Sequence, residues 1–261
     1  MAALNLFPHS SLTVTVIYIL WLRQLKRYVR SRARMIGSLG QPVLFLFALG
    51  FGLGPVFKEA NGGNYLDFLA PGVIAMSILF TAIFSGIEMI WDRQFGFLKE
   101  TFVAPVSRIS IMLGRTLGGA TVATLQGFIV FLITLLAGFR PESWTLVPLA
   151  VICMFLIALT FTALGTAIAS TMEDMQGFQL IMNFLVMPLF FLSGALFPLT
   201  NLPPALAIIV RLDPLSYGVD ALRFTLTGVG HWPISLSLGI LCLILVIFMF
   251  LGSWLFSRVE L

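Results

Sequence analysis

Few residues in this chain have the types and spacing that catalysis requires. The two histidines, His9 and His231, lie outside the long apolar segments and away from any candidate nucleophilic serine. The sequence has no HExxH motif, no paired aspartates within an apolar segment and no Cys/His cluster. It also lacks a Gly-Lys dipeptide, and therefore a phosphate-binding loop. We expect no catalysis and no bound cofactor or metal; if ATP is used, another subunit binds it.

Glu88 is the one acidic residue in the inner part of an apolar segment. Burial of its charge at the bilayer centre would cost a few kcal/mol. Because it lies near one end of its segment, its side chain can extend to the interface, and Arg115 is within reach. A proton relay would require a chain of such groups, so a structural role is predicted.

Asp220 and Arg223 are three residues apart, which places them on one helical face and predicts an ion pair. They lie in segment 201–230, which is apolar in patches but interrupted by prolines. Broken helices are tolerated at membrane depth where they are buried in protein. We expect two short re-entrant helices on the outer side; an exposed outer loop is the alternative.

The composition indicates an integral membrane protein. Of the 261 residues, 59% are hydrophobic and only 10% are charged, against about 25% charged in soluble domains. The net charge of +4 does not indicate nucleic acid, because six of the fifteen Lys and Arg residues lie between Arg23 and Arg34, beside an apolar segment. Cys153 and Cys242 are interpreted as small hydrophobic residues.

The elements that must position these residues are helices. We predict one all-α transmembrane domain, residues 1–261, with an N-terminal interfacial helix, a cytoplasmic helix and the re-entrant segment. The six expected spans are 35–57, 67–91, 109–137, 145–171, 177–199 and 233–256.

Lys and Arg residues set the expected orientation. With the N-terminus inside, eleven lie on the inner side and four on the outer. The 170–177 turn is anomalous, with Glu173, Asp174 and no base. Acidic residues have little weight in this rule, so the predicted orientation stands. We expect a multi-pass protein of the inner or plasma membrane with both termini in the cytoplasm.

Residues 12–30 begin with an apolar stretch too short to span and continue with basic residues, Trp21 and Tyr28. This order is the reverse of a signal peptide. It suits a helix lying along the membrane surface; a plain charged leader is the alternative.

Residues 94–104 form a charged segment between two apolar ones. On a helix, Phe95, Leu98 and Phe102 share one face, and Pro105 ends the helix. Such a helix either rests on lipid headgroups or fits a groove on a cytoplasmic partner, and spacing alone does not choose. Two Gly-x-x-x-Gly motifs, Gly50–Gly54 and Gly114–Gly118, permit close helix contacts, including oligomer contacts.

Two stretches together resemble the permease family of type-2 ABC exporters, especially the daunorubicin-resistance type. They are "FGFLKETFVAPVSR" (95–108) and "LFFLSGALFPLTNLPPALAIIVRLDPLSYGVDALR" (189–223). Pro214, Leu215, Tyr217 and Arg223 match the second signature, and Val186 is a small departure from it.

The resemblance implies a permease homodimer in the lipid bilayer with two ABC ATP-binding subunits, which bind ATP and Mg. The segment 94–104 would be the coupling helix, contacting the ATPase through Phe95, Gly96, Leu98, Lys99, Glu100, Phe102, Ala104 and Pro105. The segment 201–230 would be the outer gate, with Pro214, Tyr217, Asp220 and Arg223.

We expect an ATP-driven exporter of an amphiphilic or hydrophobic substrate (drug, lipid or lipid-linked glycan), since the spans offer little charge for a small ion. An ion-coupled secondary carrier would need ionisable residues near mid-membrane. A non-transporting membrane assembly protein is the third possibility.

Overall fold

The computed structural model describes residues 9–52, 54, 64–97, 107–199 and 202–257. These residues are all-helical and contain no strand. Within them, six stretches are long and apolar enough to cross a membrane: Met35–Gly52, Tyr65–Gln94, Arg108–Leu136, Trp144–Ser170, Met175–Leu192 and Ile234–Phe256. The prediction of an all-α protein with six spans is confirmed at this level.

The helices succeed one another along the chain with short connections. They are α1 (His9–Arg30), α2 (Arg32–Gly52), α4 (Tyr65–Phe84), α5 (Ile87–Gln94), α7 (Arg108–Leu136), η1 (Trp144–Leu146), α8 (Val147–Ser170), α9 (Met175–Leu192), α10 (Pro204–Leu212), α11 (Pro214–Thr227) and α12 (Ile234–Ser257).

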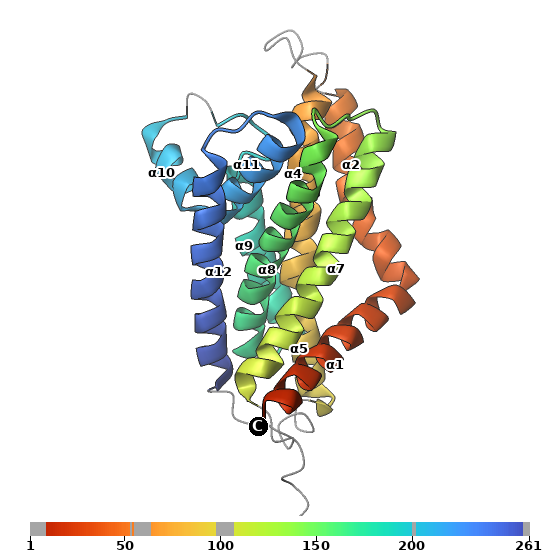
Figure 1. Ribbon diagram of the computed structural model, residues 1–261, viewed down its shortest axis with the longest axis vertical. Helices are drawn as coiled ribbons and strands as arrows, with labels where there is room; N and C mark the ends of the chain where they lie inside the picture. Colours follow the sequence, from red (N-terminus) through yellow and green to blue (C-terminus); the bar gives the residue numbers. More distant parts are fainter. Residues whose placement is uncertain (1–8, 53, 55–63, 98–106, 200–201, 258–261) are drawn as a thin grey trace, which may run out of the picture.

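Helices α4, α7 and α8 form the centre of the bundle, with α2, α9 and α12 around them (Figure 1). In the second span 72% of the most apolar window is buried, against 11% in the last span. The outer helices therefore present apolar side chains outward, as lipid-facing helices do. Helices α10 and α11 cover one end of the bundle; α5 and the start of α7 lie at the other, which we call the α5 end.

The second span is two helices where one was predicted over 67–91. The α4 hydrogen-bond ladder tightens at Gly86, whose N–H donates to the Ile83 carbonyl, and the Glu88 N–H donates to Ser85. These bonds join residues three apart, so the chain turns more tightly here. A Cβ on Gly86 would lie 2.5 Å from the Gly165 carbonyl oxygen of α8. The turn thus brings α4 and α8 into backbone contact.

Helix α1 crosses α7 obliquely (Figure 1) and packs along it. A Cβ on Gly114 would lie 3.1 Å from the Ile17 Cα, and one on Gly118 would lie 2.8 Å from the Gln24 Cβ. The second Gly-x-x-x-Gly motif therefore receives α1 of the same chain. In addition, the Trp21 Nε1 donates to the Thr121 hydroxyl at 3.0 Å.

The acidic 170–177 turn has a structural explanation. The Asp174 carboxylate caps α9 by accepting from the Gln176 and Gly177 N–H groups. Glu173 pairs with Arg93 at 3.0 Å, an exposed contact at the end of α5. Both acids therefore have local partners, which explains their place in a turn without bases.

Candidate functional site

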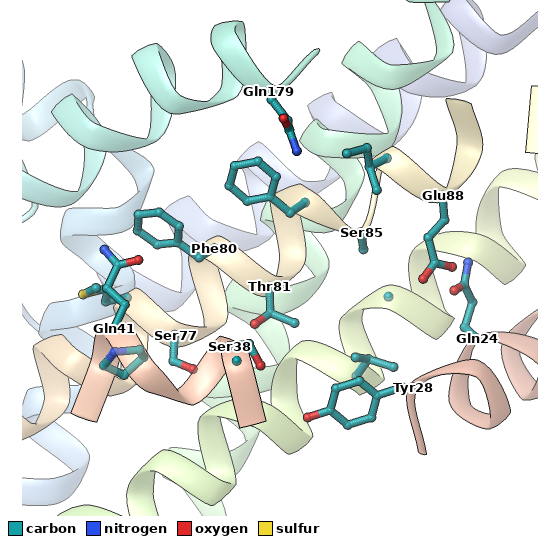
Figure 2. Close-up of a pocket in the computed structure, with 17 residues that line it drawn as sticks. Gln24, Tyr28, Ser38, Gln41, Ser77, Phe80, Thr81, Ser85, Glu88 and Gln179 are labelled. Atoms are coloured by element: carbon teal, nitrogen blue, oxygen red, sulfur yellow. The ribbon is translucent and has the colours of Figure 1, made fainter. Parts of the chain in front are cut away.

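Helices α4 and α5 carry a continuous polar face. Ser77, Thr81 and Ser85 follow at four-residue steps, and Glu88 follows three residues later, across the tightened turn. A three-residue step keeps side chains aligned where hydrogen bonds join residues three apart. These four side chains line a cavity of about 370 Å³ inside the bundle (Figure 2). This volume lies within the range of small-molecule sites, about 300–1,000 Å³.

The other walls of the cavity come from α1, α2, α7 and α9. The polar side chains that line these walls are Gln24, Tyr28, Ser38, Gln41 and Gln179. The Tyr28 hydroxyl donates to the Gln126 Oε1 of α7, a buried bond that fixes the end of α1 against the bundle. Sequence reasoning missed this cavity, because α1, α2 and α9 each contribute only one or two of these polar side chains.

Glu88 is the charged side chain among the described residues that line the cavity. Its carboxylate lies 3.2 Å from the Arg27 Nη1 of α1. The structural role predicted for Glu88 stays a prediction. Arg115 was the partner expected from the sequence, but Arg115 instead donates to Asp92, at 2.7 Å. The reason is that Arg115 lies opposite the next turn of α5, where Asp92 projects.

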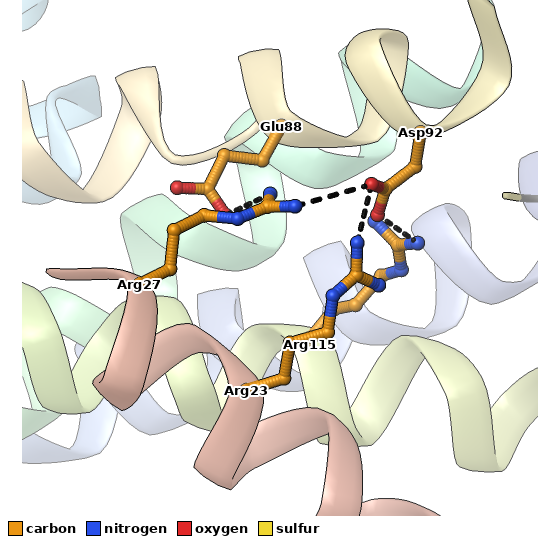
Figure 3. Close-up of polar contacts among 5 residues, drawn as sticks. All are labelled: Arg23, Arg27, Glu88, Asp92 and Arg115. Carbon is orange, nitrogen blue, oxygen red and sulfur yellow. Dashed lines mark hydrogen bonds and ion pairs between the residues drawn. The ribbon is translucent and has the colours of Figure 1, made fainter. Parts of the chain in front are cut away.

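Beside the cavity, five charged residues form a network joining α1, α5 and α7 (Figure 3); Glu88, Asp92 and Arg115 are buried, whereas Arg23 and Arg27 are partly exposed. The Asp92 carboxylate accepts hydrogen bonds from the Arg23 Nη2 at 2.6 Å and from the Arg115 Nη2 at 2.7 Å. The Arg27 Nη2 lies 3.6 Å from the Asp92 Oδ1. The Arg115 side chain is only 3% exposed. A buried charge is tolerated when it is paired and hydrogen-bonded, so this pairing allows the buried members of the network to remain charged inside the bundle.

Asp92 is the main residue that sequence reasoning missed. It was assigned no role from the sequence, because it directly follows the predicted span 67–91. The signal was the four-residue spacing of Glu88 and Asp92, which places both acids on one helical face.

Only the beginning of the predicted coupling helix lies in the described part of the chain. Gln94 is the last residue of α5, and Gly96 has a positive φ of 77°, so a helix starting at residue 94 is wrong at that end. Phe95 is 79% exposed. Leu98, Lys99, Glu100, Phe102, Ala104 and Pro105 lie outside the described residues.

Arg23 connects the charge network to this segment. Its guanidinium lies 3.7 Å from the centre of the Phe97 ring while it also contacts Asp92. A cation over an aromatic face is attracted to it. The residues just after α5 are therefore in contact with α1.

The predicted Asp220–Arg223 pair is not formed among the described residues; each side chain binds backbone instead. The Asp220 oxygens accept from the His231 and Trp232 N–H groups at 2.6 and 3.0 Å. The Arg223 Nη2 donates to the Gly194 carbonyl at 2.8 Å, and its guanidinium lies 4.1 Å from the Phe68 ring centre. The pair was wrong because both groups meet unpaired backbone atoms at helix ends, which spacing does not reveal.

Pro214 and Tyr217 lie in the same buried helix. Pro214 is the first residue of α11, and the Asp213 carboxylate caps that helix. Burial raises the pKa of Asp213 to about 7, against the lowering effect of its bonds from Leu215 and Ser216. The Tyr217 hydroxyl donates to the Arg211 carbonyl, and its ring contacts Trp232. The four predicted gate residues are thus distributed along one helix that is bonded to its neighbours.

No group of three or more His, Cys, Asp or Glu side chains suited to a metal ion occurs in the described ranges.

A sequence profile of the ABC-2 type transporter family matches residues 15–227 of this chain. The chain belongs to the ABC-2 type transporter family. It is a multi-pass permease of an ABC transporter, without ATPase activity of its own, and permeases of this family work with ATP-binding subunits that hydrolyse ATP. The resemblance stated from the sequence is confirmed.

Individual relatives agree with this assignment. The chain is 30% identical over 230 residues to Nodulation protein J of Rhizobium leguminosarum bv. viciae, covering 87% of each chain. It is 28% identical over 277 residues to the putative transport permease ycf38 of Cyanophora paradoxa, covering 99% of this chain and 95% of that one. The corresponding protein of Pyropia yezoensis is 31% identical over 227 residues, covering 82% and 76%.

Proposed function

We propose that this permease exports an amphiphilic substrate from the cytoplasm or the inner leaflet, as a homodimer with two ATP-binding subunits. The observation that carries the proposal is the cavity lining, which combines the polar face of α4–α5 with the stacked rings of Phe80 and Phe84. A site with both surfaces suits a molecule with a polar and an apolar part. The α5 end faces the cytoplasm in this proposal, with both termini inside.

The charge network supports coupling between the ATPase and the bundle. Segment 94–104 begins at the last residue of α5, and Asp92 near the end of α5 is paired with α1 and α7. A displacement of the segment therefore acts on three helices through short ion pairs. ATP would drive transport by favouring a state in which these helices pack differently. Helices α10 and α11 would form the outer gate.

An ion-coupled carrier is less well supported. Such a carrier needs carboxylates that exchange a proton or cation during transport. Glu88 and Asp92 are instead held by arginines.

The test is co-purification of the ATP-binding subunit with the tagged permease. Phe95→Asp replaces an exposed ring near the start of segment 94–104 with a charge. If this position is buried against the ATPase, the variant should bind at least about tenfold less ATPase, since burial of an unpaired charge costs several kcal/mol. Val229→Asp is the matched control, because Val229 is also exposed but lies before α12, at the opposite end of the bundle. Equal ATPase retention by both variants would refute coupling through the α5 end.

A further inference from the structure

We propose that the cavity between α1, α2, α4 and α7 binds the head group of the substrate, and that this head group is uncharged and rich in hydroxyl or amide groups. This inference rests on the proposed function and adds the chemical class of the substrate. It separates a glycan-like head group from the cationic head group of many drugs.

The charge of the cavity carries the first step. Among the described lining residues, Glu88 provides the charge, and Arg27 neutralises it at 3.2 Å. A cationic head group would have to displace Arg27 from Glu88, which breaks the 3.2 Å ion pair and leaves Arg27 with its longer contact to Asp92 at 3.6 Å. An anionic head group would face the Glu88 carboxylate. Both are costly in a site of low dielectric constant, so the lining favours a neutral group.

The second argument for a neutral head group is a buried hydroxyl that lacks a hydrogen-bond partner. Ser77 is 2% exposed, and its Oγ has no hydrogen-bond partner among the described residues. A buried polar atom without a partner costs free energy that a bound ligand can recover. Ser77 lines the cavity together with Thr81, one turn further along α4.

The remaining polar groups are of the same neutral kind. Gln24, Gln41 and Gln179 reach the cavity from three helices, and each amide both donates and accepts. Hydroxyl and amide groups of a ligand match this mixture of donors and acceptors, whereas a trimethylammonium group donates nothing.

The aromatic side chains of the cavity indicate where the apolar part of the substrate would lie. Phe80 and Phe84 stack with ring centres 6.2 Å apart on α4 and line the same cavity. In Figure 2, Phe80 and Ser77 project from successive turns of α4, so polar and apolar surfaces adjoin. An amphiphile would place its head group on the Ser77 side and its chain along the rings.

The experiment measures binding of three fluorescent amphiphiles to the permease–ATPase complex in nanodiscs, without ATP. The probes share one dodecyl chain and carry a maltose, a trimethylammonium or a sulfate head group. Nanodiscs without protein give the lipid background. We expect the maltoside to bind at least about tenfold more tightly than either charged probe. Tighter binding of the cationic probe, or equal binding of all three, would overturn the proposal.

Two cavity variants locate the site. Ser77→Ala and Thr81→Val each remove a hydroxyl and nearly conserve shape, and should weaken maltoside binding about fivefold each, as expected for one hydrogen bond of about 1 kcal/mol. The control is Ser237→Ala in α12, since the buried Ser237 Oγ also lacks a partner among the described residues but does not line the cavity.

Thermal unfolding separates binding from folding. Ser77→Ala removes a buried hydroxyl that no described residue bonds, so the ligand-free variant should be as stable as the wild type or more stable. Unchanged maltoside affinity in Ser77→Ala, or equal weakening in Ser237→Ala, would place the head group elsewhere. Failure of the ATPase to co-purify would refute the proposed function instead, and the probes could still be measured on the permease alone.

Discussion

Asp92 is the residue on which the charge network depends. Its two oxygens hold Arg23 of α1 and Arg115 of α7 at 2.6 and 2.7 Å, in surroundings where a lone charge is costly. The partners differ, because the Arg23 side chain is 26% exposed and Arg115 only 3%. Water therefore compensates Arg23 when its partner is lost, but not Arg115.

This difference gives the first prediction. Asp92→Asn should destabilise the permease by about 3 kcal/mol or more, because Arg115 remains buried and charged. Arg23→Gln should cost about 1 kcal/mol or less, since partly exposed pairs contribute little. The measurement is the thermal unfolding midpoint in one lipid composition. The double variant Asp92→Asn/Arg115→Gln should recover part of the loss, and equal losses for Asp92→Asn and Arg23→Gln would contradict the network.

A second prediction concerns Asp220 and Arg223. Because Asp220 binds the amides before α12 and Arg223 binds the Gly194 carbonyl, their contributions should be nearly additive, within about 0.5 kcal/mol. A double-mutant cycle with Asp220→Ala and Arg223→Ala, measured by unfolding, checks this. A coupling energy above about 1.5 kcal/mol would indicate a direct ion pair.

Sequence reasoning reached only part of the site at this scale. Glu88 was found because an acid within an apolar segment is conspicuous. Its partner was misassigned, because Arg115 lies opposite the next turn of α5 and binds Asp92 there, while Arg27 of α1 binds Glu88. Ser77 and Thr81 passed unnoticed, because single hydroxyls are ordinary in membrane helices and become informative only when a cavity joins them.

At the scale of helices, α4–α5 and α8 meet backbone to backbone at one point. Gly86 and Gly165 face each other, so the two backbones meet directly. Small residues allow such an approach in membranes, where dispersion forces and close packing hold helices together. The position of the turn in the second span is therefore fixed against α8.

The third prediction follows from this contact. A Cβ on Gly165 would lie 2.9 Å from the Ile83 Cα, a backbone atom that cannot rotate away. Gly165→Ala should destabilise the permease by about 1–3 kcal/mol through overpacking. Gly40→Ala in α2 is the matched control, because nothing lies within 4 Å of its Cβ position. The control should be neutral or stabilising by up to about 1 kcal/mol; similar losses in both would show that α4 and α8 are not in close contact.

The six spans were predictable because the backbone of a membrane span must satisfy its own hydrogen bonds, which requires long apolar helices. The packing of α1 against α7 was not predictable from the sequence. Its apolar face suits a lipid surface as well as it suits α7. The packing against α7 is shown by the close contacts at Gly114 and Gly118 and by the bond from Trp21 to Thr121.

At the scale of the whole molecule, the two ends of the bundle differ in charge. The basic residues of α1 and α7 gather toward the α5 end, where Arg23, Arg27 and Arg115 meet the network. Arg140 and His231 lie in the connections that precede η1 and α12, at the α11 end. The membrane-facing surface between the ends is apolar, so orientation depends on these charges.

The fourth prediction tests that orientation. In a background with Cys153 and Cys242 replaced by alanine, single cysteines at Arg140 and His231 should react with an impermeant thiol reagent in intact cells. A cysteine at Glu173 should react only after the membrane is opened. Labelling of Glu173→Cys in intact cells would reverse the orientation or change the number of spans.

The charge network also has a consequence for biosynthesis. Ribosomes make Arg23 and Arg27 before Glu88 and Asp92, and Arg115 follows Asp92 by only 23 residues. Each carboxylate of the network thus emerges after an arginine partner, and Arg115 emerges after its aspartate. By the time α7 leaves the ribosome, every charge in the network has a partner available for entry into the bilayer. The first three spans can therefore be inserted as one paired unit while α8, α9 and α12 have yet to be translated.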